Sequence, residues 1–315
     1  MSTEQSAAAV RDALSGRLRI PAIAAPMLGV SGRRLVSAVC REGVIGAFPT
    51  ANARSVAELD EWLTGWERER DADDRAWAPW CANLIIRQPR LADDLEMLVR
   101  HRVEMVITSV GSPAPVVAPL QDAGAVVLAD VASMHHAERA IAAGVDGLVL
   151  LTAGAGGQTG RLNPFAFVRE VRAHFDGLVV LAGGIADGVA LRAATALGAD
   201  LGYLGTRFVA AEESLASDDY RTMLVESSMD DVVLTRAFTG LPSSMLRASI
   251  VAAGLDPDHL DEDVEPEDAT ALYGSGAVGP RRWRDIRSAG HTVSAVDRVE
   301  PAAALIARIA REYDT

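Results

Sequence analysis

Short apolar runs rich in β-branched residues alternate with amphipathic segments from Arg19 onward. Such an alternation is typical of βα units around a parallel sheet, whose strands are apolar on both faces. The pattern predicts strands at eight places: residues 20–25, 44–48, 80–86, 103–109, 125–130, 147–151, 178–182 and 200–205. The chain is therefore expected to be an α/β protein with eight parallel strands.

Helical spacing fills the segments between these runs, and each helical pattern closes with glycine or a polar turn. The clearest helices are expected at residues 33–41, 91–102, 134–143 and 189–197. Residues 144–146 and 198–200, both Gly-x-Asp, mark the same helix-to-strand turn twice. Eight βα units fit a closed (β/α)8 TIM barrel, but a doubly wound open sheet would show a similar alternation.

The strand rhythm stops after Ser214, and a strand-poor, acidic region runs from residue 216 to about 279. We expect a mainly helical extension with a loop there, and interpret the acidic run 256–263 as a solvated face. Residues 301–313 have helical spacing and should dock on the barrel. The first 15 residues are a helix or a loose tail. The expected division is a barrel at 1–215, an extension at 216–282 and a C-terminal turn and helix at 283–315.

The composition of the chain narrows the classes of function that it can have. The 315 residues are 49% hydrophobic and carry a net charge of −13, which supplies no basic face for a nucleic-acid partner. Small molecules are the expected partners. Cys40 and Cys81 suit two buried thiols in a reducing compartment, so we expect a cytoplasmic protein. Residues 1–10 contain Glu4 and no apolar run long enough for a signal peptide, so none is expected, and no apolar stretch approaches the length of a membrane span.

Two glycine-containing strand ends are the strongest chemical signal. The seventh strand ends in Ala182-Gly183-Gly184-Ile185 and the eighth in Gly205-Thr206. Glycine lets a backbone N–H approach a phosphate closely, and the loops after strands seven and eight are the common phosphate site of (β/α)8 barrels. A tight turn alone would explain the first pair. The matching pair after the next strand favours a phosphate site and, with it, the closed barrel.

Two further strand ends suit a ligand. Ala25-Pro26-Met27 follows the first strand, where proline fixes the backbone and methionine can lie against a flat ring. A glycine-rich loop follows the sixth strand: Thr152-Ala153-Gly154-Ala155-Gly156-Gly157-Gln158-Thr159-Gly160. No ordinary core needs so many glycines, so we expect this loop to wrap a ligand, with a flexible surface linker as the alternative.

Together these segments resemble the nitronate monooxygenase (2-nitropropane dioxygenase) family, whose relatives include flavin-dependent enoyl-thioester reductases. The segments that carry the resemblance are residues 21–27, 82–84, 107–113, the glycine-rich loop, 182–185, 205–208 and 213–214. Residues 235–240 and 288–291 look like parts of the family's substrate-side extension. The resemblance implies a (β/α)8 barrel that binds FMN and no metal.

The resemblance also assigns cofactor contacts by position. The positions are Ala25, Pro26, Met27, Asn83, Asp130, Gly157, Gly183, Gly184, Gly205 and Thr206. It places the phosphate on the last four, the flavin ring or its tail against Ala25–Met27 and Asn83, and a polar cofactor contact at Asp130. From the residues alone, Asn83 could instead cap the next turn, and Asp130 could be a helix N-cap before Ser133.

One position departs from the family. Its glycine-rich loop typically ends Gly-Gly-His-x-Gly, and that histidine is the proposed base that removes the proton alpha to a nitro group. Here the residue is Gln158, whose amide cannot accept a proton near neutral pH. This substitution argues against oxidation of neutral nitroalkanes. A nitronate is already deprotonated, so Gln158 needs only to orient it.

His291 is the candidate for a substitute base, because the resemblance places its segment near the substrate. The alternative is an ordinary loop histidine. The remaining candidates, His101, His135, His136 and His174, are expected to face solvent or cap helices.

Three functions stay open. The first is an FMN-dependent monooxygenase of small alkyl nitronates in which O2 reoxidises the flavin. The second is a reductase or dehydrogenase that acts on a C=C bond of an acyl thioester with NAD(P)H as electron donor. The third is a flavin-binding protein that has lost catalysis. The sequence leaves the physiological substrate, the redox partner and the oligomeric state open.

Overall fold

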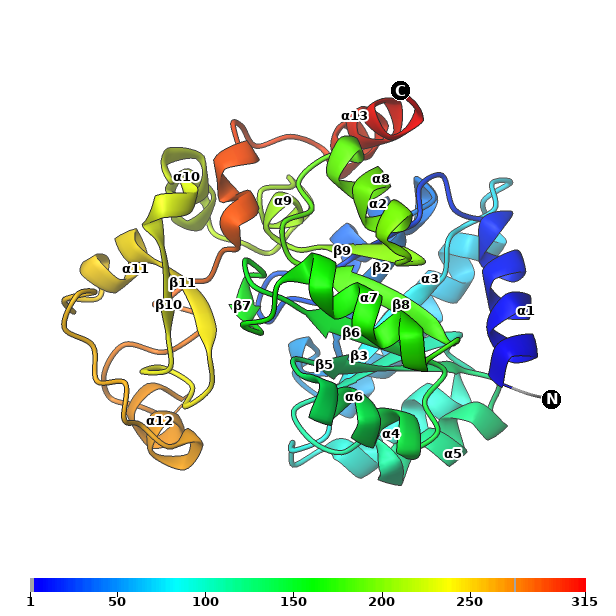
Figure 1. The fold of residues 1–315 in the computed structure, drawn as a ribbon, viewed down its shortest axis with the longest axis horizontal. Coiled ribbons are helices and arrows are strands. Elements are labelled where there is room, and N and C mark those ends of the chain that lie inside the picture. Colours follow the sequence, from blue (N-terminus) through cyan, green and yellow to red (C-terminus); the bar gives the residue numbers. More distant parts are fainter. Residues whose placement is uncertain (1–2, 275) are drawn as a thin grey trace.

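A computed structural model describes residues 3–274 and 276–315 of the chain. Eight parallel strands close into a barrel in the order β1-β2-β3-β4-β5-β6-β8-β9 (Figure 1). The strands are β1 (Ala22–Ala24), β2 (Ile45–Pro49), β3 (Trp80–Ile85), β4 (Met105–Ser109), β5 (Val126–Val131), β6 (Gly147–Leu151), β8 (Leu178–Ala182) and β9 (Leu201–Leu204). All eight predicted strands are confirmed, and no boundary differs by more than two residues.

The barrel closes by parallel pairing of β1 with β9, in which Ala22 faces Gly202 and Ala24 faces Leu204. This closure decides between the two folds that the sequence pattern left open, because an open sheet would leave both strands at an edge.

Both faces of the strands are buried, which explains their continuous apolar character. Side chains such as Cys81, Ile107 and Val149 fill the barrel interior, and their neighbours on the strands pack outward against the helices. The two cysteines are free and buried, as predicted.

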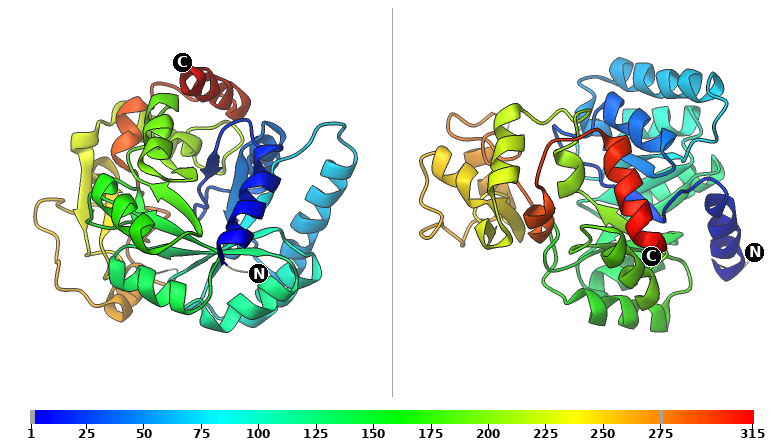
Figure 2. Two further views of the ribbon diagram at one scale, coloured as in Figure 1. Left: turned by 45° about the vertical axis from the view of Figure 1, so that its right-hand side comes forward. Right: turned by 90° about the horizontal axis from the view of Figure 1, so that it is seen from above.

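Helices cover the outside of the barrel (Figure 2). They are α2 (Arg33–Arg41), α3 (Val56–Asp71), α4 (Leu91–Arg100), α5 (Ala114–Asp122), α6 (Met134–Ala142), α7 (Pro164–His174), α8 (Gly188–Leu197) and the short α9 (Thr206–Val209). The last helix, α13 (Ala302–Asp314), packs against α8 and α2 through a buried apolar face. Its docking was predicted from its spacing.

The repeated Gly-x-Asp turn has the same geometry in both places. In each, the glycine adopts a positive φ, 84° at Gly144 and 111° at Gly198. The carboxylates of Asp146 and Asp200 each accept a backbone N–H at the start of the neighbouring strand, at 2.8 and 2.7 Å. The repeat therefore ties successive strands together at the N-terminal end of the barrel.

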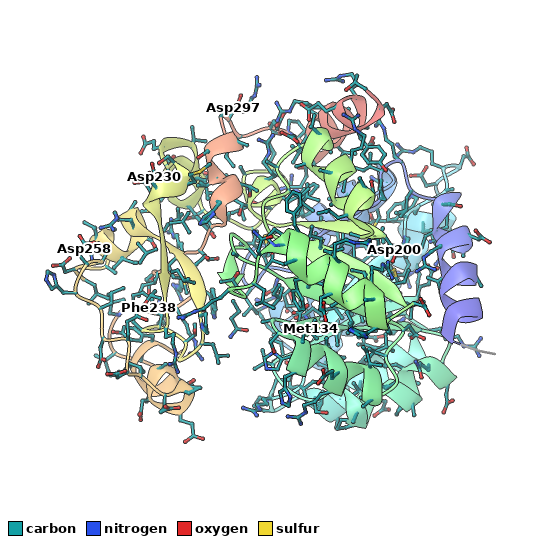
Figure 3. All side chains as sticks on the ribbon, in the orientation of Figure 1. Met134, Asp200, Asp230, Phe238, Asp258 and Asp297 are labelled. Atoms are coloured by element: carbon teal, nitrogen blue, oxygen red, sulfur yellow. The ribbon has the colours of Figure 1, made fainter. Side chains whose placement is uncertain are left out.

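The first helix, α1 (Thr3–Ser15), closes this N-terminal end, with Leu14 packed against the interior cluster. Arg11 pairs with Asp200 at 2.8 Å, and Asp200 is labelled beside the helix in Figure 3. Residues 3–15 are thus a docked helix rather than a loose tail.

The extension lies at the opposite end of the barrel from α1 (Figures 1 and 2). Its elements are α10 (Asp218–Glu226), η2 (Met229–Asp231), β10 (Val232–Thr235), β11 (Ser243–Leu246), α11 (Arg247–Ala252), α12 (Pro266–Tyr273) and η3 (His291–Ala295). The predicted helices are present, but the β10–β11 hairpin was not predicted. It pairs with the two-residue strand β7 (Gly157–Gln158), which belongs to the glycine-rich loop.

None of the helices in the described ranges is both long and apolar enough to cross a membrane.

Candidate active site

The loop after β1 forms one side of the C-terminal mouth of the barrel. Ser31 Oγ donates to the carbonyl of Ala25 at 3.1 Å and accepts the N–H of Met27 at 3.0 Å. Asn52, in the 3-10 turn η1 (Thr50–Asn52), donates to the carbonyl of Met27 at 2.9 Å. Ala25 is buried, whereas Pro26 and Met27 are partly exposed. Ser31 and Asn52 are not recognisable from the sequence, because their role depends on a contact between two loops.

The loops after β8 and β9 place four predicted phosphate contacts at the same mouth. In the part of the chain that the structure describes, the backbone N–H groups of Gly183, Gly184, Gly205 and Thr206 donate to no protein acceptor. Gly184 has a φ of +75°, and a Cβ built on it would meet no atom within 4 Å. Free donors beside open space are what an anion cradle requires.

The N-terminus of α8, directly after these glycines, is already satisfied by protein groups. Asp187 accepts the N–H of Ala190 at 2.8 Å, and Glu312 accepts the N–H of Gly188 at 3.1 Å. Because two carboxylates occupy this helix end, the available donors for an anion are those of the glycine loops.

The two sides of the mouth meet at Gly205. A Cβ on Gly205 would lie 3.6 Å from the Cβ of Ala25 and 3.7 Å from Sδ of Met27. Thr206 Oγ1 accepts the N–H of Gly290 at 2.9 Å and keeps its own hydroxyl hydrogen for another partner. The predicted segments after β1 and β9 are thus in one site.

Asn83 lies in the C-terminal half of β3, two residues before its end, and is 6% exposed. Its amide donates to the carbonyl of Ile107 at 3.2 Å and to Ser109 Oγ at 3.1 Å, both on the neighbouring strand β4. The alternative that it caps its own next turn is wrong. These bonds fix the amide at the mouth of the barrel.

Asp130 is a carboxyl group without a hydrogen-bond partner for its buried Oδ1. The residue as a whole keeps partial exposure near the end of β5. Burial raises the pKa of Asp130 to about 7. The alternative that Asp130 caps α6 is wrong, because Ser133 is the N-cap and accepts the N–H of His136 at 3.2 Å.

The glycines of the glycine-rich loop have a packing reason that the sequence did not reveal. A Cβ on Gly156 would lie 2.7 Å from the backbone nitrogen of Gly290, and one on Gly160 would lie 2.1 Å from the carbonyl oxygen of Leu151. The loop therefore lies against residues 289–291 of the chain's last segment. Part of its glycine content is required by this close approach of two backbones.

Gln158 is held by β7, where it pairs with Ser243 of β11. Among the described residues its side-chain amide forms no hydrogen bond, and the residue is half-buried. Gly157, the other residue of β7, has a φ of +66°. The extension hairpin thus fixes the backbone of Gln158 and leaves its amide free.

His291 lies against the same loop. Its backbone N–H donates to the carbonyl of Gly154 at 3.0 Å, and its ring Nδ1 is 3.0 Å from where a Cβ of Gly154 would be. The side chain is exposed. The structure brings both predicted catalytic residues, Gln158 and His291, to the glycine-rich loop, but they form no hydrogen bond with each other.

Trp283 is a residue that sequence analysis missed. Its φ of +68° is unfavourable for a bulky side chain, and its ring lies 3.7 Å from where a Cβ of Gly157 would be. Its carbonyl oxygen lies 3.9 Å from the corresponding point on Gly29, in the loop after β1. Such strain is commonly found at functional sites. Here the indole ring lies beside the glycine-rich loop, and the backbone carbonyl lies beside the loop after β1.

His135 and His136 are exposed in the first turn of α6, as expected. His101 is the C-cap residue of α4, as expected, and its partly buried ring bridges Glu67 at 2.9 Å and Asp60 at 2.7 Å, both on α3. His174 is exposed beside Glu170.

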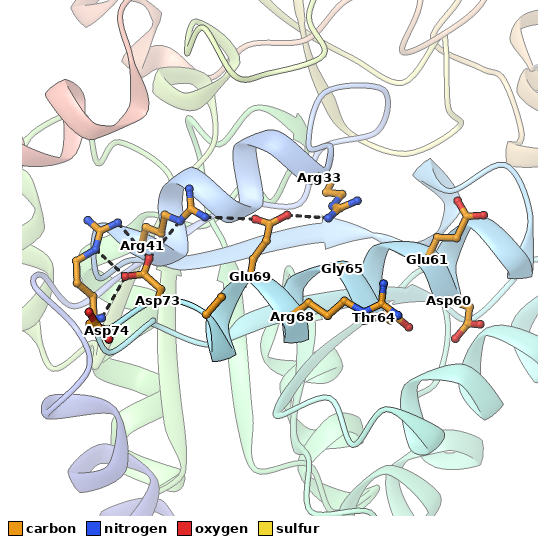
Figure 4. A pocket seen from close by; sticks show the side chains of 12 residues that line it. Arg33, Arg41, Asp60, Glu61, Thr64, Gly65, Arg68, Glu69, Asp73 and Asp74 are labelled. Carbon is orange, nitrogen blue, oxygen red and sulfur yellow. Dashed lines mark hydrogen bonds and ion pairs between the residues drawn. The ribbon is translucent and has the colours of Figure 1, made fainter.

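A shallow groove on the outer wall of the barrel lies between α2 and α3 (Figure 4). Its charges pair with one another: Arg33 contacts Glu69 at 2.7 Å, and Arg41 contacts Asp73 at 3.4 Å. It belongs to the helical layer and not to the mouth. Within the described residues, no group of three or more histidine, cysteine or acidic side chains could hold a metal ion.

The mouth fits a phosphorylated planar cofactor. Four unpaired N–H groups and the open space at Gly184 suit a phosphate, while Met27 and the fixed amide of Asn83 offer contacts for a flat ring. The fold is a (β/α)8 barrel, and backbone donors left free after strands β8 and β9 are typical of barrel enzymes that bind an anionic ligand there.

Comparisons with known proteins agree with this class. The family model described as nitronate monooxygenase matches residues 83–312. A nitronate monooxygenase of Paraburkholderia phytofirmans is 30% identical, over 93% of this chain and 92% of its own length. A (3aS,4S,5R,7aS)-5-hydroxy-7a-methyl-1-oxo-octahydro-1H-indene-4-carboxyl-CoA dehydrogenase of Mycobacterium tuberculosis is 28% identical, over 73% of this chain and 64% of its own. The solved structure of a nitroalkane oxidase from Streptomyces ansochromogenes superposes with a TM-score of 0.73 and 27% identity, covering 96% of this chain and 98% of that one.

The chain belongs to the nitronate monooxygenase family. It is an oxidoreductase of a flavin-dependent family that acts on small molecules.

Proposed function

We propose that this protein is an FMN-dependent nitronate monooxygenase that oxidises small alkyl nitronates with O2. The observation that carries the proposal is the free amide of Gln158 at the position where the family's base is expected. A nitronate brings its negative charge with it and requires a hydrogen-bond donor but no base.

Different residues of the mouth bind different parts of the cofactor. Gly183, Gly184, Gly205 and Thr206 supply free backbone N–H groups for the phosphate. The remaining contacts come from Ala25, Pro26, Met27, Asn83, Asp130 and Gly157. When bound, FMN accepts electrons from the substrate and passes them to O2.

The chain's own contribution to the chemistry is to orient the substrate. The hairpin β10–β11 fixes the backbone at Gln158, so its amide can donate to an oxygen of the nitronate. Trp283 and the segment around His291 border the same loop and restrict the space beside it. These contacts keep the substrate in one orientation while the extension limits access of water.

The test is anaerobic reduction of the purified protein in three parallel arms with propyl-nitronate, NADH and NADPH, followed by flavin bleaching. We expect propyl-nitronate to bleach the flavin faster than either nicotinamide, and admission of O2 to restore its colour. Bleaching by NADH or NADPH alone would contradict the proposal.

A second candidate function is NAD(P)H-dependent reduction or dehydrogenation at the C=C bond of an acyl thioester. It is favoured by the similarity to a dehydrogenase whose name specifies a CoA ester. Gln158 would not prevent hydride transfer between the flavin and such a substrate. If NAD(P)H reduces the flavin, an enoyl thioester reoxidises it and nitronate does nothing, this function replaces the first.

A further inference from the structure

The sequence leaves few groups that can take a proton at the mouth. The chain contains no lysine, and position 158 is an amide. His291 is exposed, and its ring lies beside Gly154 of the glycine-rich loop. A carboxyl group is the remaining kind of side chain that accepts protons near neutral pH once it is buried.

We infer that Asp130 is the proton acceptor of this site and removes the proton alpha to the nitro group of a neutral nitroalkane. The inference rests on the proposed function and extends its substrates from nitronates to the nitroalkanes from which they form. It assigns the missing base to β5 instead of the glycine-rich loop.

The position of Asp130 follows from the strand. Side chains two residues apart on a strand point the same way, and Leu128 belongs to the barrel interior together with Val149. Asp130 is the partner of Val149 in the parallel register of β5 and β6. It therefore faces inward, one layer nearer the mouth than Leu128.

Nothing structural explains a carboxyl group there. Its buried Oδ1 accepts no hydrogen bond, it does not cap α6, and among the described residues it has no ion pair with arginine or histidine. A buried acid without a partner is costly for folding, so it is more commonly found where it acts on a ligand.

The surroundings give this carboxyl group a suitable basicity. Two titratable groups influenced by its charge lie on other strands, Tyr203 of β9 and Cys81 of β3. Burial raises the pKa of both well above neutrality, so both remain uncharged while Asp130 titrates. Burial alone raises the pKa of Asp130 to about 7, which leaves much of it ionised at neutral pH. His135 and His136, in the first turn of α6, form no ion pair with it.

The step is balanced without another reactant. The C–H bond alpha to the nitro group breaks, its electron pair forms the C=N bond of the nitronate, and the proton goes to a carboxylate oxygen of Asp130. The nitronate keeps the negative charge that Asp130 loses. Gln158 can then donate to a nitronate oxygen, and the proton leaves to solvent at the mouth before the next cycle.

The test compares wild type with Asp130→Asn, using fresh neutral nitroalkane and preformed nitronate between pH 5 and pH 9. Wild-type kcat/KM for nitroalkane should rise with pH around a midpoint of about 7, because the ionised carboxylate is the active form. In Asp130→Asn the ratio of kcat/KM for nitroalkane to kcat/KM for nitronate should fall about 10²–10⁴-fold, because only the nitroalkane needs a proton removed.

Proton removal can also be measured separately from oxidation of the substrate. Under anaerobic conditions, with the flavin of the holoenzyme already reduced, the α-hydrogen of the nitroalkane should exchange into D2O, followed by NMR. Wild type should catalyse this exchange and Asp130→Asn should not. Asp94→Asn is the matched control, since Asp94 is buried but pairs with Arg90 on the outer layer. This control should exchange at the wild-type rate.

The possible outcomes distinguish the assignment of Asp130 as the base from the proposed function. If wild type oxidises nitronate while Asp130→Asn keeps full nitroalkane turnover and exchange, the assignment of Asp130 is overturned and the proposed function stands. Loss of nitronate and nitroalkane turnover together, with FMN still bound, would show that Asp130 positions the site and is not its base. If wild type oxidises no nitronate, the proposed function fails and the assignment fails with it. Should Asp130→Asn lose FMN, Asp130→Ser in the exchange assay decides in the same way.

Discussion

At the scale of the residue, Gly184 makes the phosphate site testable. Its positive φ and open surroundings mean that a side chain there would be strained and would fill the cradle. We expect Gly184→Val to be purified largely without FMN, as measured by the ratio of flavin to protein absorbance.

Gly144 is the matched control for this substitution. It also has a positive φ, +84°, and no atom within 4 Å of a built Cβ, but it lies in a turn at the N-terminal end of the barrel. Gly144→Val should lose similar stability and keep FMN. Full flavin occupancy in Gly184→Val would show that the phosphate binds elsewhere.

Gln158 gives a second residue-scale prediction, which depends on the assignment of Asp130. A histidine at position 158 would supply a base in the loop where the family typically has one. In the Asp130→Asn background, Gln158→His should therefore restore nitroalkane turnover by at least tenfold and change nitronate turnover much less. Steady-state kinetics on both substrates measure this. An unchanged nitroalkane rate would mean that position 158 is out of reach of the α-hydrogen.

The raised pKa of Asp130 also predicts that the free energy of unfolding depends on pH. Its pKa is about 7 in the fold and about 3.9 in an unfolded chain, so the folded state holds a proton that the unfolded state has released between these values. The free energy of unfolding contributed by this group is highest below about pH 4 and falls as pH rises to about 7. The measurement is the difference in Tm between wild type and Asp130→Asn, both depleted of FMN. We expect this difference to fall between about pH 4 and about pH 7 and to stay constant at higher pH. A constant difference would contradict the burial of the carboxyl.

At the scale of the element, the segment around Trp283 connects the extension to the barrel mouth. The backbone N–H of Trp283 donates to the carbonyl of Ile286 at 2.8 Å, and this turn holds the residue in the left-handed region. Left-handed backbone costs a non-glycine residue about 1–2 kcal/mol. Trp283→Gly should therefore be more stable than Trp283→Ala by about 1 kcal/mol, the reverse of the usual order in helices.

Chemical denaturation of the two variants measures this difference, and a more stable alanine variant would contradict the backbone geometry. Both variants lose the indole beside Gly157. Both should consequently raise KM for nitronate, while the flavin content stays at the wild-type level.

At the scale of the whole molecule, the repeated elements could be predicted from the sequence. Elements that depend on contacts between distant segments could not. The eight strands were predictable because burial on both faces makes each one apolar throughout, and Gly-x-Asp marks the same turn at Asp146 and Asp200. The β10–β11 hairpin was not, since its short strands lie in an acidic region and pair with two residues of a distant loop.

In the candidate site, too, some residues could be predicted from the sequence and others could not. Glycines after β8 and β9 were recognisable because a phosphate needs backbone donors without a Cβ. Trp283, Ser31 and the buried state of Asp130 were not recognisable as features of the site, because each depends on which elements surround it. The packing of residues 289–291 on the glycine-rich loop likewise becomes visible only in three dimensions.

FMN at the barrel mouth is the feature on which the proposed chemistry depends most directly. Purified protein should be yellow and should release about one FMN per chain on denaturation, identified by chromatography against FMN and FAD. Release of FMN in this ratio is the predicted result. Release of FAD, or no flavin even after reconstitution with FMN, would contradict the account.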